Sequence, residues 1–320
     1  IQNMNEDAQR SKNLKSLLSA WTKVVAGTSL PHPPRFEGPD VWITQLTEKT
    51  AEVIPGACFI ARVRETSDGH PYIGLAVKNG AKMILAQRPL DEIEADIPAE
   101  VVYIQVQDTA VASAWLAAAW EGFPSRDLVV IGITGTDGKT STANIMLSIL
   151  RAADIPTGLL STTRAVIGSV EEPLALHVTT PEAPVVQRLL RRMVDAGLTH
   201  CILEATSHGL AQHRVGAIDF DLAVVTNITH EHLDYHGDFD HYLAAKSRLF
   251  AGLSTDPWQV KTSNQAKQNQ VKTAVLNRDD TSFEHLSIIP VPRQINYAIN
   301  APADVLAADI HYTDGKTLFT

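Results

Sequence analysis

The chain has 320 residues, of which 44% are apolar, 20% are charged and 6% are aromatic, and its formal net charge is −9. These values are typical of a globular protein with room for two hydrophobic cores, and the negative charge argues against a broad nucleic-acid-binding face. The N-terminus is polar and no apolar run approaches the roughly 20 residues of a membrane helix, so we expect a cytoplasmic protein with no membrane partner.

The first part of the chain predicts a small α/β unit. We expect helices over residues 14–24, 71–80 and 110–120, and strands over residues 57–63, 83–86 and 101–106. Gly, Pro and Ser interrupt the pattern at residues 121–127. We therefore expect an N-terminal α/β domain of residues 1–124 and a second domain of residues 125–320.

After this boundary, strands alternate with helices. We expect strands over residues 128–133, 200–205 and 222–227, and helices over residues 139–153, 184–196 and 239–250. In the first of these helices, Ile145, Ile149 and Ala152 share one face. Such alternation predicts a mostly parallel sheet with right-handed crossovers.

The last part of the second domain differs in composition. Residues 256–272 are polar and rich in Gln, Asn and Lys, which predicts an exposed loop, and residues 273–320 are predicted to be rich in strands. The only cysteines of the chain are Cys58 and Cys201, and both lie in apolar, strand-like runs. They predict two buried, reduced thiols and exclude a cysteine metal cluster.

A glycine-rich turn, Gly132-Ile-Thr-Gly-Thr-Asp-Gly-Lys-Thr140, joins the first predicted strand of this domain to its first helix. The strict phosphate-loop pattern requires a glycine where Ile133 stands, but an apolar strand precedes the turn and a helix follows Lys-Thr. Glycine allows successive amides to point at phosphates, and the helix N-terminus adds positive potential. The turn therefore predicts a site for ATP with Mg²⁺, in which Lys139 contacts the β/γ-phosphates and the Thr140 hydroxyl ligates the metal.

The pentapeptide Thr-Asp-Gly-Lys-Thr occurs twice, at residues 136–140 and 313–317. The second copy has no upstream glycines and no predicted helix after it. Its Asp314-Gly315 pair favours a hairpin turn. The local letters alone therefore do not predict phosphate binding.

Three further features carry possible chemistry. Glu204 ends a predicted strand at the sheet edge where ligands bind, which favours a magnesium ligand over a water-exposed carboxylate. Residues 226–236 hold three histidines and two acids, and their spacing alone does not identify a ligand. Lys246 lies among small residues in a predicted helix, where most lysines are simply solvated.

The order of these motifs resembles the Mur ligase family, in particular its UDP-N-acetylmuramoyl-tripeptide synthetase (MurE) branch. The resemblance covers about residues 45–320. The segments that carry it are the glycine-rich turn, Thr179-Thr-Pro181, Glu204-Ala-Thr-Ser-His-Gly-Leu-Ala-Gln-His-Arg214, Thr226-Asn, His232-Leu-Asp-Tyr-His-Gly and Tyr242-Leu-Ala-Ala-Lys246.

The resemblance implies an ATP-dependent amide ligase of peptidoglycan synthesis. In this family ATP phosphorylates the terminal carboxylate of UDP-MurNAc-L-Ala-D-Glu, and the amine of an incoming amino acid then attacks the acyl phosphate. The implied fold is an N-terminal UDP-binding α/β domain, a central ATP-binding sheet of phosphate-loop type and a third, Rossmann-like domain. We expect that third domain to be absent from these 320 residues and this fragment to be inactive alone.

The resemblance also implies residue roles. Thr140, Glu204, His232 and Lys246 match magnesium-site residues, with Lys246 carbamylated, and Lys139, Lys246 and His232 are the expected catalytic residues. The positions that match nucleotide contacts are Gly135, Thr136, Asp137, Gly138, Lys139, Thr140, Ser141 and Asn227. The positions that match UDP-MurNAc-dipeptide contacts are Thr50, Thr179, Thr180, Thr206, Gln212 and Arg214. Carbamylation requires a neutral amine, so we expect the pKa of Lys246 to lie below the usual value of about 10.4.

The sequence departs from the family at several positions. Asp137 replaces the usual Asn of the phosphate loop, and Val178 replaces a polar residue. Lys49-Thr50-Ala51 replaces Asp-Ser-Arg in a segment that contacts uridine in the family, so the arginine is lost. These departures leave two alternatives open, a ligase of folylpolyglutamate type with another carboxylate acceptor and a non-catalytic nucleotide-binding protein.

Overall fold

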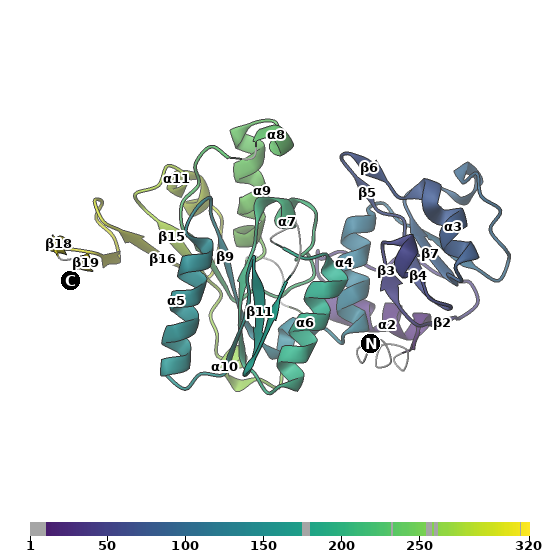
Figure 1. The fold of residues 1–320 in the computed structure, drawn as a ribbon, viewed down its shortest axis with the longest axis horizontal. Coiled ribbons are helices and arrows are strands. Elements are labelled where there is room, and N and C mark those ends of the chain that lie inside the picture. The colour runs from purple at the N-terminus through teal and green to yellow at the C-terminus, as the bar shows by residue number, and fades with distance from the viewer. Residues whose placement is uncertain (1–10, 175–179, 232, 254–257, 259–261, 314) are drawn as a thin grey trace.

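The computed structural model describes residues 11–174, 180–231, 233–253, 258, 262–313 and 315–320. Two separate sheets dominate it, one of four strands and one of nine. Figure 1 shows the smaller sheet towards one end of the long axis and the C-terminal hairpin at the other, with the larger sheet between them. The described helices include none with the length and apolar character that crossing a membrane requires.

The N-terminal sheet is entirely parallel, in the order β3-β4-β7-β8. Its strands are β3 (Leu46–Thr47), β4 (Cys58–Ile60), β7 (Met83–Ala86) and β8 (Val102–Gln105), and its helices are α2 (Leu14–Val25), α3 (Ile73–Lys78) and α4 (Thr109–Trp120). Alternate residues point to opposite faces of a strand. Cys58 and Ile60 therefore pack towards α2 and α4, whereas Phe59 packs towards α3.

Short elements connect these strands and helices. They are β1 (Lys12–Asn13), β2 (Trp42–Ile43), the hairpin β5 (Val63–Arg64) and β6 (Ser67–Asp68), and the 3-10 turns η1 (Thr50–Glu52), η2 (His70–Tyr72), η3 (Leu90–Glu92) and η4 (Pro124–Asp127). Trp115 of α4 stacks on Trp21 of α2, and Trp258 from the larger part of the chain packs against the same ring at 5.5 Å. An aromatic cluster thus joins the two parts.

The larger sheet has the order β12-β11-β10-β13-β9-β14-β15-β16-β17. The parallel strands are β9 (Val129–Thr134), β10 (Thr157–Leu160), β13 (His200–Glu204), β14 (Leu222–Val225), β15 (Thr273–Asn277), β16 (Arg293–Ala298) and β17 (Val305–Leu306). At one edge, β11 (Arg164–Ile167) and β12 (Val170–Pro173) run antiparallel. Every residue of the central strand β9 is buried, as expected for a strand covered on both faces.

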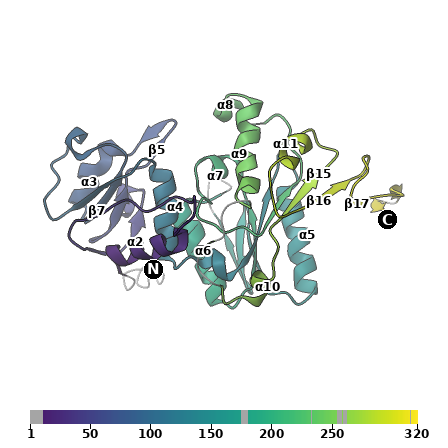
Figure 2. The ribbon, with the colours of Figure 1, turned by 180° about the vertical axis from the view of Figure 1, so that it is seen from behind.

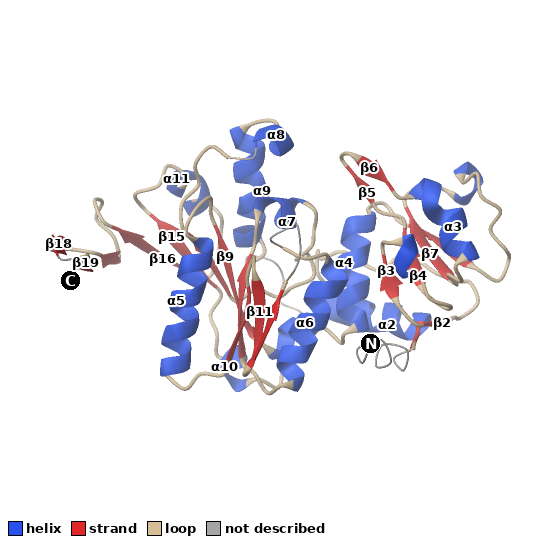
Figure 3. Ribbon diagram, in the orientation of Figure 1, coloured by secondary structure: helices blue, strands red, loops and turns tan. Residues whose placement is uncertain are grey.

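Helices cover both faces of this sheet (Figure 3). They are α5 (Lys139–Ala152), α6 (Ala183–Asp195), α7 (Ser207–Ala211), α8 (Leu233–His236), α9 (Phe239–Ala251), α10 (Gln265–Gln268) and α11 (Phe283–Ser287). Ala143 and Leu147 of α5 pack on one face, while α6, α9 and α11 contribute to the core on the other. The view from behind in Figure 2 shows α5 and α6 on opposite sides of the strands. The predicted α/β class with a mostly parallel sheet is confirmed.

The structure adds to one sequence observation and corrects one prediction. The face of α5 that Ile145 and Ile149 share is exposed, and Ala143 and Leu147 form the buried face. Residues 256–272, predicted to be an exposed loop, include the short helix α10 among their described residues, and Lys267 on it is buried against Asp221 at 2.5 Å. A polar composition did not reveal this, because the lysine pairs with the buried carboxylate of Asp221, which lies directly before β14 and far from α10 in the sequence.

The strand-rich tail is confirmed by β15, β16 and β17, which extend the sheet, and by β18 (His311–Thr313) and β19 (Lys316–Leu318). The last two strands pair antiparallel as a hairpin around Gly315, whose φ is +72°. Asp314 lies outside the described residues. Both cysteines are buried free thiols, as predicted.

Candidate active site

The glycine-rich turn links the buried strand β9 to α5 at the carboxyl edge of the larger sheet. Gly135 has φ +150° and Gly138 has φ +80°. A Cβ on Gly135 would lie 1.8 Å from Thr226 Oγ1, so only glycine fits there. The backbone angles of Gly135 and Gly138, and the close contact at Gly135, therefore explain why glycine is required at these positions of the predicted phosphate loop.

The end of β14 holds this turn in place. Thr226 Oγ1 donates to the Asp137 carbonyl at 2.6 Å, and Asn227 Oδ1 accepts from the Asp137 amide at 3.0 Å. Asp137 uses its backbone for these contacts, while the residue is exposed. Ser141, in the first turn of α5, is also exposed.

Lys139 begins α5 and folds back over the turn. Its ammonium donates to the carbonyls of Gly135 at 2.8 Å and Thr136 at 2.6 Å. Burial lowers its pKa, while nearby acidic groups oppose that shift. An ammonium has three donors, so one N–H of Lys139 remains for a further acceptor.

Glu204 ends β13 beside the turn, and it is 2% exposed. Its Oε2 accepts from the hydroxyls of Thr140 and Thr162, both at 2.9 Å. Its Oε1 is buried and accepts no hydrogen bond from any described residue. Thr162 was not predicted, although a hydroxyl shortly after the parallel strand β10 is a signal that the sequence offers.

These oxygens suit a hard cation. Mg²⁺ prefers carboxylate and hydroxyl oxygens, and a buried carboxylate oxygen without a donor is a ready ligand. The described residues hold no group of three or more His, Cys, Asp and Glu side chains suited to a metal, so the fit rests on Thr140 and Glu204. His232, the other predicted ligand, lies outside the described residues.

Lys246 lies on α9 and is 1% exposed. Its ammonium donates to the Gly135 carbonyl at 2.6 Å, the oxygen that also accepts from Lys139. Burial, followed by repulsion from Lys139, lowers the pKa of Lys246 to about 7. The lowered pKa expected from the sequence is thus present.

Tyr242 connects Lys246 to the turn, and sequence reasoning missed it. Its hydroxyl lies 3.0 Å from Thr136 Oγ1, and the Lys246 ammonium lies 4.6 Å from the centre of its ring. Burial raises the pKa of Tyr242 to about 12, so the phenol stays neutral. Its position one helical turn before Lys246 is the signal that was available.

Four of the predicted substrate-binding residues lie together at the carboxyl end of β13. Thr180 Oγ1 lies 3.0 Å from Thr206 Oγ1 and donates to the Glu204 carbonyl. Arg214 donates to the Thr180 carbonyl at 2.6 Å and to Gln212 Oε1. Arg214 is thus buried against its neighbours, and Thr179 lies outside the described residues.

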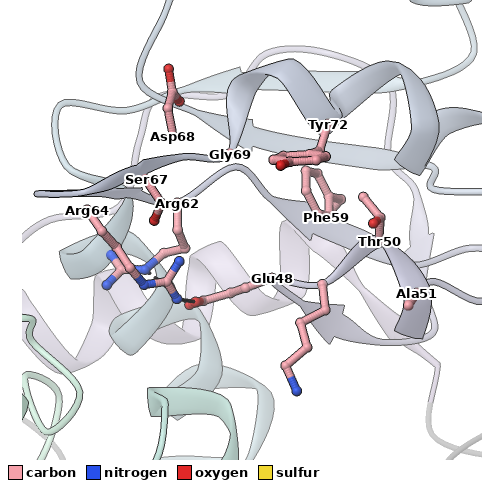
Figure 4. Close-up of a pocket in the computed structure, with 11 residues that line it drawn as sticks. Glu48, Thr50, Ala51, Phe59, Arg62, Arg64, Ser67, Asp68, Gly69 and Tyr72 are labelled. Atoms are coloured by element: carbon pink, nitrogen blue, oxygen red, sulfur yellow. Dashed lines mark hydrogen bonds and ion pairs between the residues drawn. The ribbon is translucent and has the colours of Figure 1, made fainter.

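Thr50 lies elsewhere, in the turn η1 of the N-terminal part, where it lines a pocket of about 230 Å³ (Figure 4). Within the segment that departs from the family pattern, Lys49 forms a surface ion pair with Glu52. The neighbouring Glu48 is buried and contacts both Arg62 at 3.2 Å and Arg64 at 2.6 Å. Burial raises the pKa of Glu48, while the two arginines oppose the shift. This charged group was not predicted, because its members lie far apart in the sequence.

Known proteins resemble this chain over most of its length. A family model described as the Mur ligase middle domain matches residues 133–320. The UDP-N-acetylmuramoyl-L-alanyl-D-glutamate–2,6-diaminopimelate ligase of Geobacillus kaustophilus is 37% identical over 298 residues, covering 91% of this chain and 57% of that protein. A UDP-N-acetylmuramyl-tripeptide synthetase of Roseiflexus sp. is 39% identical, covering 82% of this chain and 50% of that protein.

The fold has a solved counterpart as well. A structure of a UDP-N-acetylmuramoyl-L-alanyl-D-glutamate–2,6-diaminopimelate ligase matches with a TM-score of 0.69 and 24% identity, covering 90% of this chain and 55% of that one. The chain therefore spans about half the length of the relatives it matches.

Proposed function

This chain belongs to the Mur ligase family, and we propose that its protein is an ATP-dependent ligase that adds an amino acid to UDP-MurNAc-L-Ala-D-Glu in peptidoglycan synthesis. The observation that carries the proposal is the site around Gly135. There, two lysine ammoniums share one carbonyl, beside a buried carboxylate with a free oxygen. The relatives' names support this acceptor over that of a folylpolyglutamate-type ligase.

In the proposed reaction the turn binds the phosphates of ATP. The N-terminus of α5 would face the anion, and Lys139 would direct its remaining N–H to the β/γ-phosphates, whereas the amides of Thr136 and Asp137 donate to Asn227. A substrate carboxylate attacking a phosphate brings two anions together, so positive charge must be held ready. Lys139 supplies that charge without moving far from its carbonyl contacts.

Magnesium would be held by Thr140 and Glu204, where it would neutralise charge on the phosphates. Thr162 orients Glu204 through the same oxygen that Thr140 contacts, which leaves Oε1 for the metal. His232 remains a proposed second-metal ligand by resemblance. Gly138, Ser141 and Asn227 remain proposed nucleotide contacts.

We also propose that Lys246 is carbamylated. The Lys246 ammonium first loses a proton to solvent. The neutral amine then attacks carbon dioxide, a C–N bond forms as one C=O π bond opens onto oxygen, and a second proton leaves to solvent, so that overall a cation becomes an anion. The buried position and the lowered pKa of Lys246 both favour the neutral amine that this step requires. The product would face Lys139 as an opposite charge.

Thr180, Thr206, Gln212 and Arg214 are proposed to position the peptide end of the substrate. They surround the carboxyl end of β13 beside Glu204, where a carboxylate has to arrive to meet ATP. Thr179 and Thr50 are proposed contacts by resemblance, the latter on the uridine side. The amine of the incoming amino acid then displaces phosphate from the acyl phosphate.

The proposed domain division remains residues 1–124 for the UDP side and 125–320 for the ATP side. The cytoplasm is the proposed location, and the two free thiols are consistent with a reducing compartment.

ADP release by the natural protein that contains this chain tests the proposal. We expect ADP formation to require both UDP-MurNAc-L-Ala-D-Glu and an amino acid, with the tripeptide product visible by mass spectrometry. Ligation to a folate-type glutamate acceptor, with none to UDP-MurNAc-dipeptide, would replace this function with the alternative. ATP binding without any ligation would support a non-catalytic role.

A further inference from the structure

Tyr235, on the short helix α8, contacts the residues proposed to position the peptide end of the substrate. Its ring packs on that of His208 from α7, with the ring centres 4.1 Å apart, and on that of His236 at 4.7 Å. These contacts hold the ring and therefore place its hydroxyl. The hydroxyl oxygen accepts a hydrogen bond from Gln212 Nε2 at 3.1 Å.

A chain of hydrogen bonds runs from this hydroxyl to the carboxyl end of β13. Gln212 Oε1 accepts from Arg214 Nε at 3.0 Å and from Arg214 Nη2 at 2.6 Å. Arg214 Nη1 donates to the Thr180 carbonyl at 2.6 Å, and Thr180 Oγ1 donates to the Glu204 carbonyl at 3.3 Å. Tyr235 is therefore linked to the strand end where the reacting carboxylate is proposed to arrive.

The chemistry of the arginine sets the direction of these hydrogen bonds. A guanidinium has only donors, so Gln212 turns its carbonyl oxygen towards Arg214 and its NH₂ group towards Tyr235. The opposite orientation of the amide would place donors against donors. The Tyr235 oxygen consequently accepts from Gln212, and the phenol proton points away from the amide.

The phenol proton has a pocket to point into. Tyr235 and Gln212 line a pocket of about 310 Å³, to which the N-terminal part of the chain contributes Arg62 and Arg64, residues that also line the pocket of Thr50. Among the described residues, Gln212 is the only hydrogen-bond partner of the Tyr235 hydroxyl. The proton is thus available to an acceptor that enters this pocket.

We propose that Tyr235 orients the substrate by donating its phenol proton to a carbonyl oxygen of the peptide in UDP-MurNAc-L-Ala-D-Glu. This inference rests on the proposed function for the identity of the substrate. Lys139 and Glu204 do not line the pocket, so neither the phosphates of ATP nor the reacting carboxylate is the acceptor. The peptide is the part that Gln212 and Arg214 are proposed to position.

The Tyr235 hydroxyl then has two roles at once. It contacts the substrate, and as the acceptor for Gln212 it keeps the Gln212 carbonyl turned towards Arg214. A purely structural role of Tyr235 would instead rest on the ring contacts with His208 and His236. Phenylalanine makes those ring contacts equally well, so the hydroxyl can be tested by itself.

Tyr235→Phe removes the hydroxyl and keeps the ring. We expect it to weaken binding of UDP-MurNAc-L-Ala-D-Glu to the natural protein by about 3- to 10-fold, the loss typical of one hydrogen bond. Binding of UDP, which lacks the sugar and the peptide, should be unchanged, as should the KM for ATP. Calorimetric titration gives both affinities, and Tyr312→Phe, an exposed tyrosine in β18, is the matched control.

Gln212→Glu tests the direction of the phenol proton. Glutamate still accepts from Arg214, but its second oxygen faces Tyr235 and would take the phenol proton in place of the substrate. Binding of UDP-MurNAc-L-Ala-D-Glu should weaken at least as much as in Tyr235→Phe. Adding Tyr235→Phe to Gln212→Glu should cause little further loss, because the proton is already diverted.

The outcomes separate this inference from the proposed function. Unchanged affinity of Tyr235→Phe for UDP-MurNAc-L-Ala-D-Glu overturns the inference, and so does an equal loss of affinity for UDP or an additive loss in the double variant. Ligation by the unaltered protein would leave the proposed function intact in each of these cases. Binding of UDP-MurNAc-L-Ala-D-Glu that depends on Tyr235, without ligation by the unaltered protein, would uphold the inference and overturn the function.

Discussion

The same five residues, Thr-Asp-Gly-Lys-Thr, form two different structures in this chain. At residues 136–140 they join the buried strand β9 to α5, in contact with the side chains of Thr226, directly after β14, and Lys246 of α9. At residues 313–317 they join β18 and β19, and every described residue of that hairpin's two strands is exposed. The difference teaches that the surroundings, rather than the pentapeptide, distinguish the proposed phosphate site. Positions of the second copy therefore provide controls for the first.

The largest expected effect distinguishes Lys139, in the first copy of the pentapeptide, from Lys316, in the second. Lys139→Ala should lower ATP-dependent turnover of the natural protein by roughly 100- to 1,000-fold, because it removes the positive charge that we propose contacts the phosphates. Lys316→Ala, in the hairpin, should leave turnover unchanged. Steady-state ADP release measures both, and a comparable loss in the two variants would show that the hairpin copy also contributes to the site.

Substitution of Gly135 and of Gly315 should lower the stability of the protein by different amounts. Gly135→Ala places a Cβ 1.8 Å from Thr226 Oγ1 at φ +150°, and we expect it to lower the free energy of unfolding by about 3 kcal/mol. Gly315 also has a positive φ, of +72°, but no atom lies within 4 Å of its Cβ position. Gly315→Ala should therefore cost only about 1 kcal/mol. Urea unfolding measures the free energy of unfolding of both variants. Equal losses would mean that the backbone around Gly135 shifts to make room for the added Cβ.

The threonines should differ in their metal dependence. Thr140→Val keeps the shape but removes the hydroxyl that donates to Glu204, so the Mg²⁺ concentration for half-maximal activity should rise about 10-fold. Thr317→Val should leave the magnesium titration unchanged. A normal titration for Thr140→Val would remove Thr140 from the metal site.

The smallest expected effect concerns Lys246, whose ammonium donates to the Gly135 carbonyl of the turn. The described residues of the hairpin make no corresponding contact. Its pKa is lowered to about 7, so the amine is mostly protonated below that pH and mostly neutral above it. The ¹³C carbamate signal formed with ¹³C-bicarbonate should therefore increase several-fold between about pH 6 and pH 8. Lys246→Arg should abolish the signal and Lys316→Arg should preserve it. A signal that survives in Lys246→Arg would assign the carbamate elsewhere.

The sequence predicted the turn well because local spacing encodes it. The buried strand, the glycines in the turn and the helix that follows Lys-Thr are all encoded by residues that neighbour one another in the sequence. The same locality predicted the parallel sheet and the hairpin of the second copy. Periodicity correctly placed α5 but did not show which face packs on the sheet, which is the face of Ala143 and Leu147, with Ile145 exposed.

The sequence by itself determined the α/β class, the glycine-rich turn between β9 and α5 and, through motif order, the family. Only the tertiary structure showed that Gly135 accepts from both Lys139 and Lys246, and that Glu48 holds Arg62 and Arg64 between two pockets. The physical reason is the separation along the chain. Backbone preferences act over a few residues, whereas desolvation and charge pairing depend on which side chains the fold brings within a few ångströms.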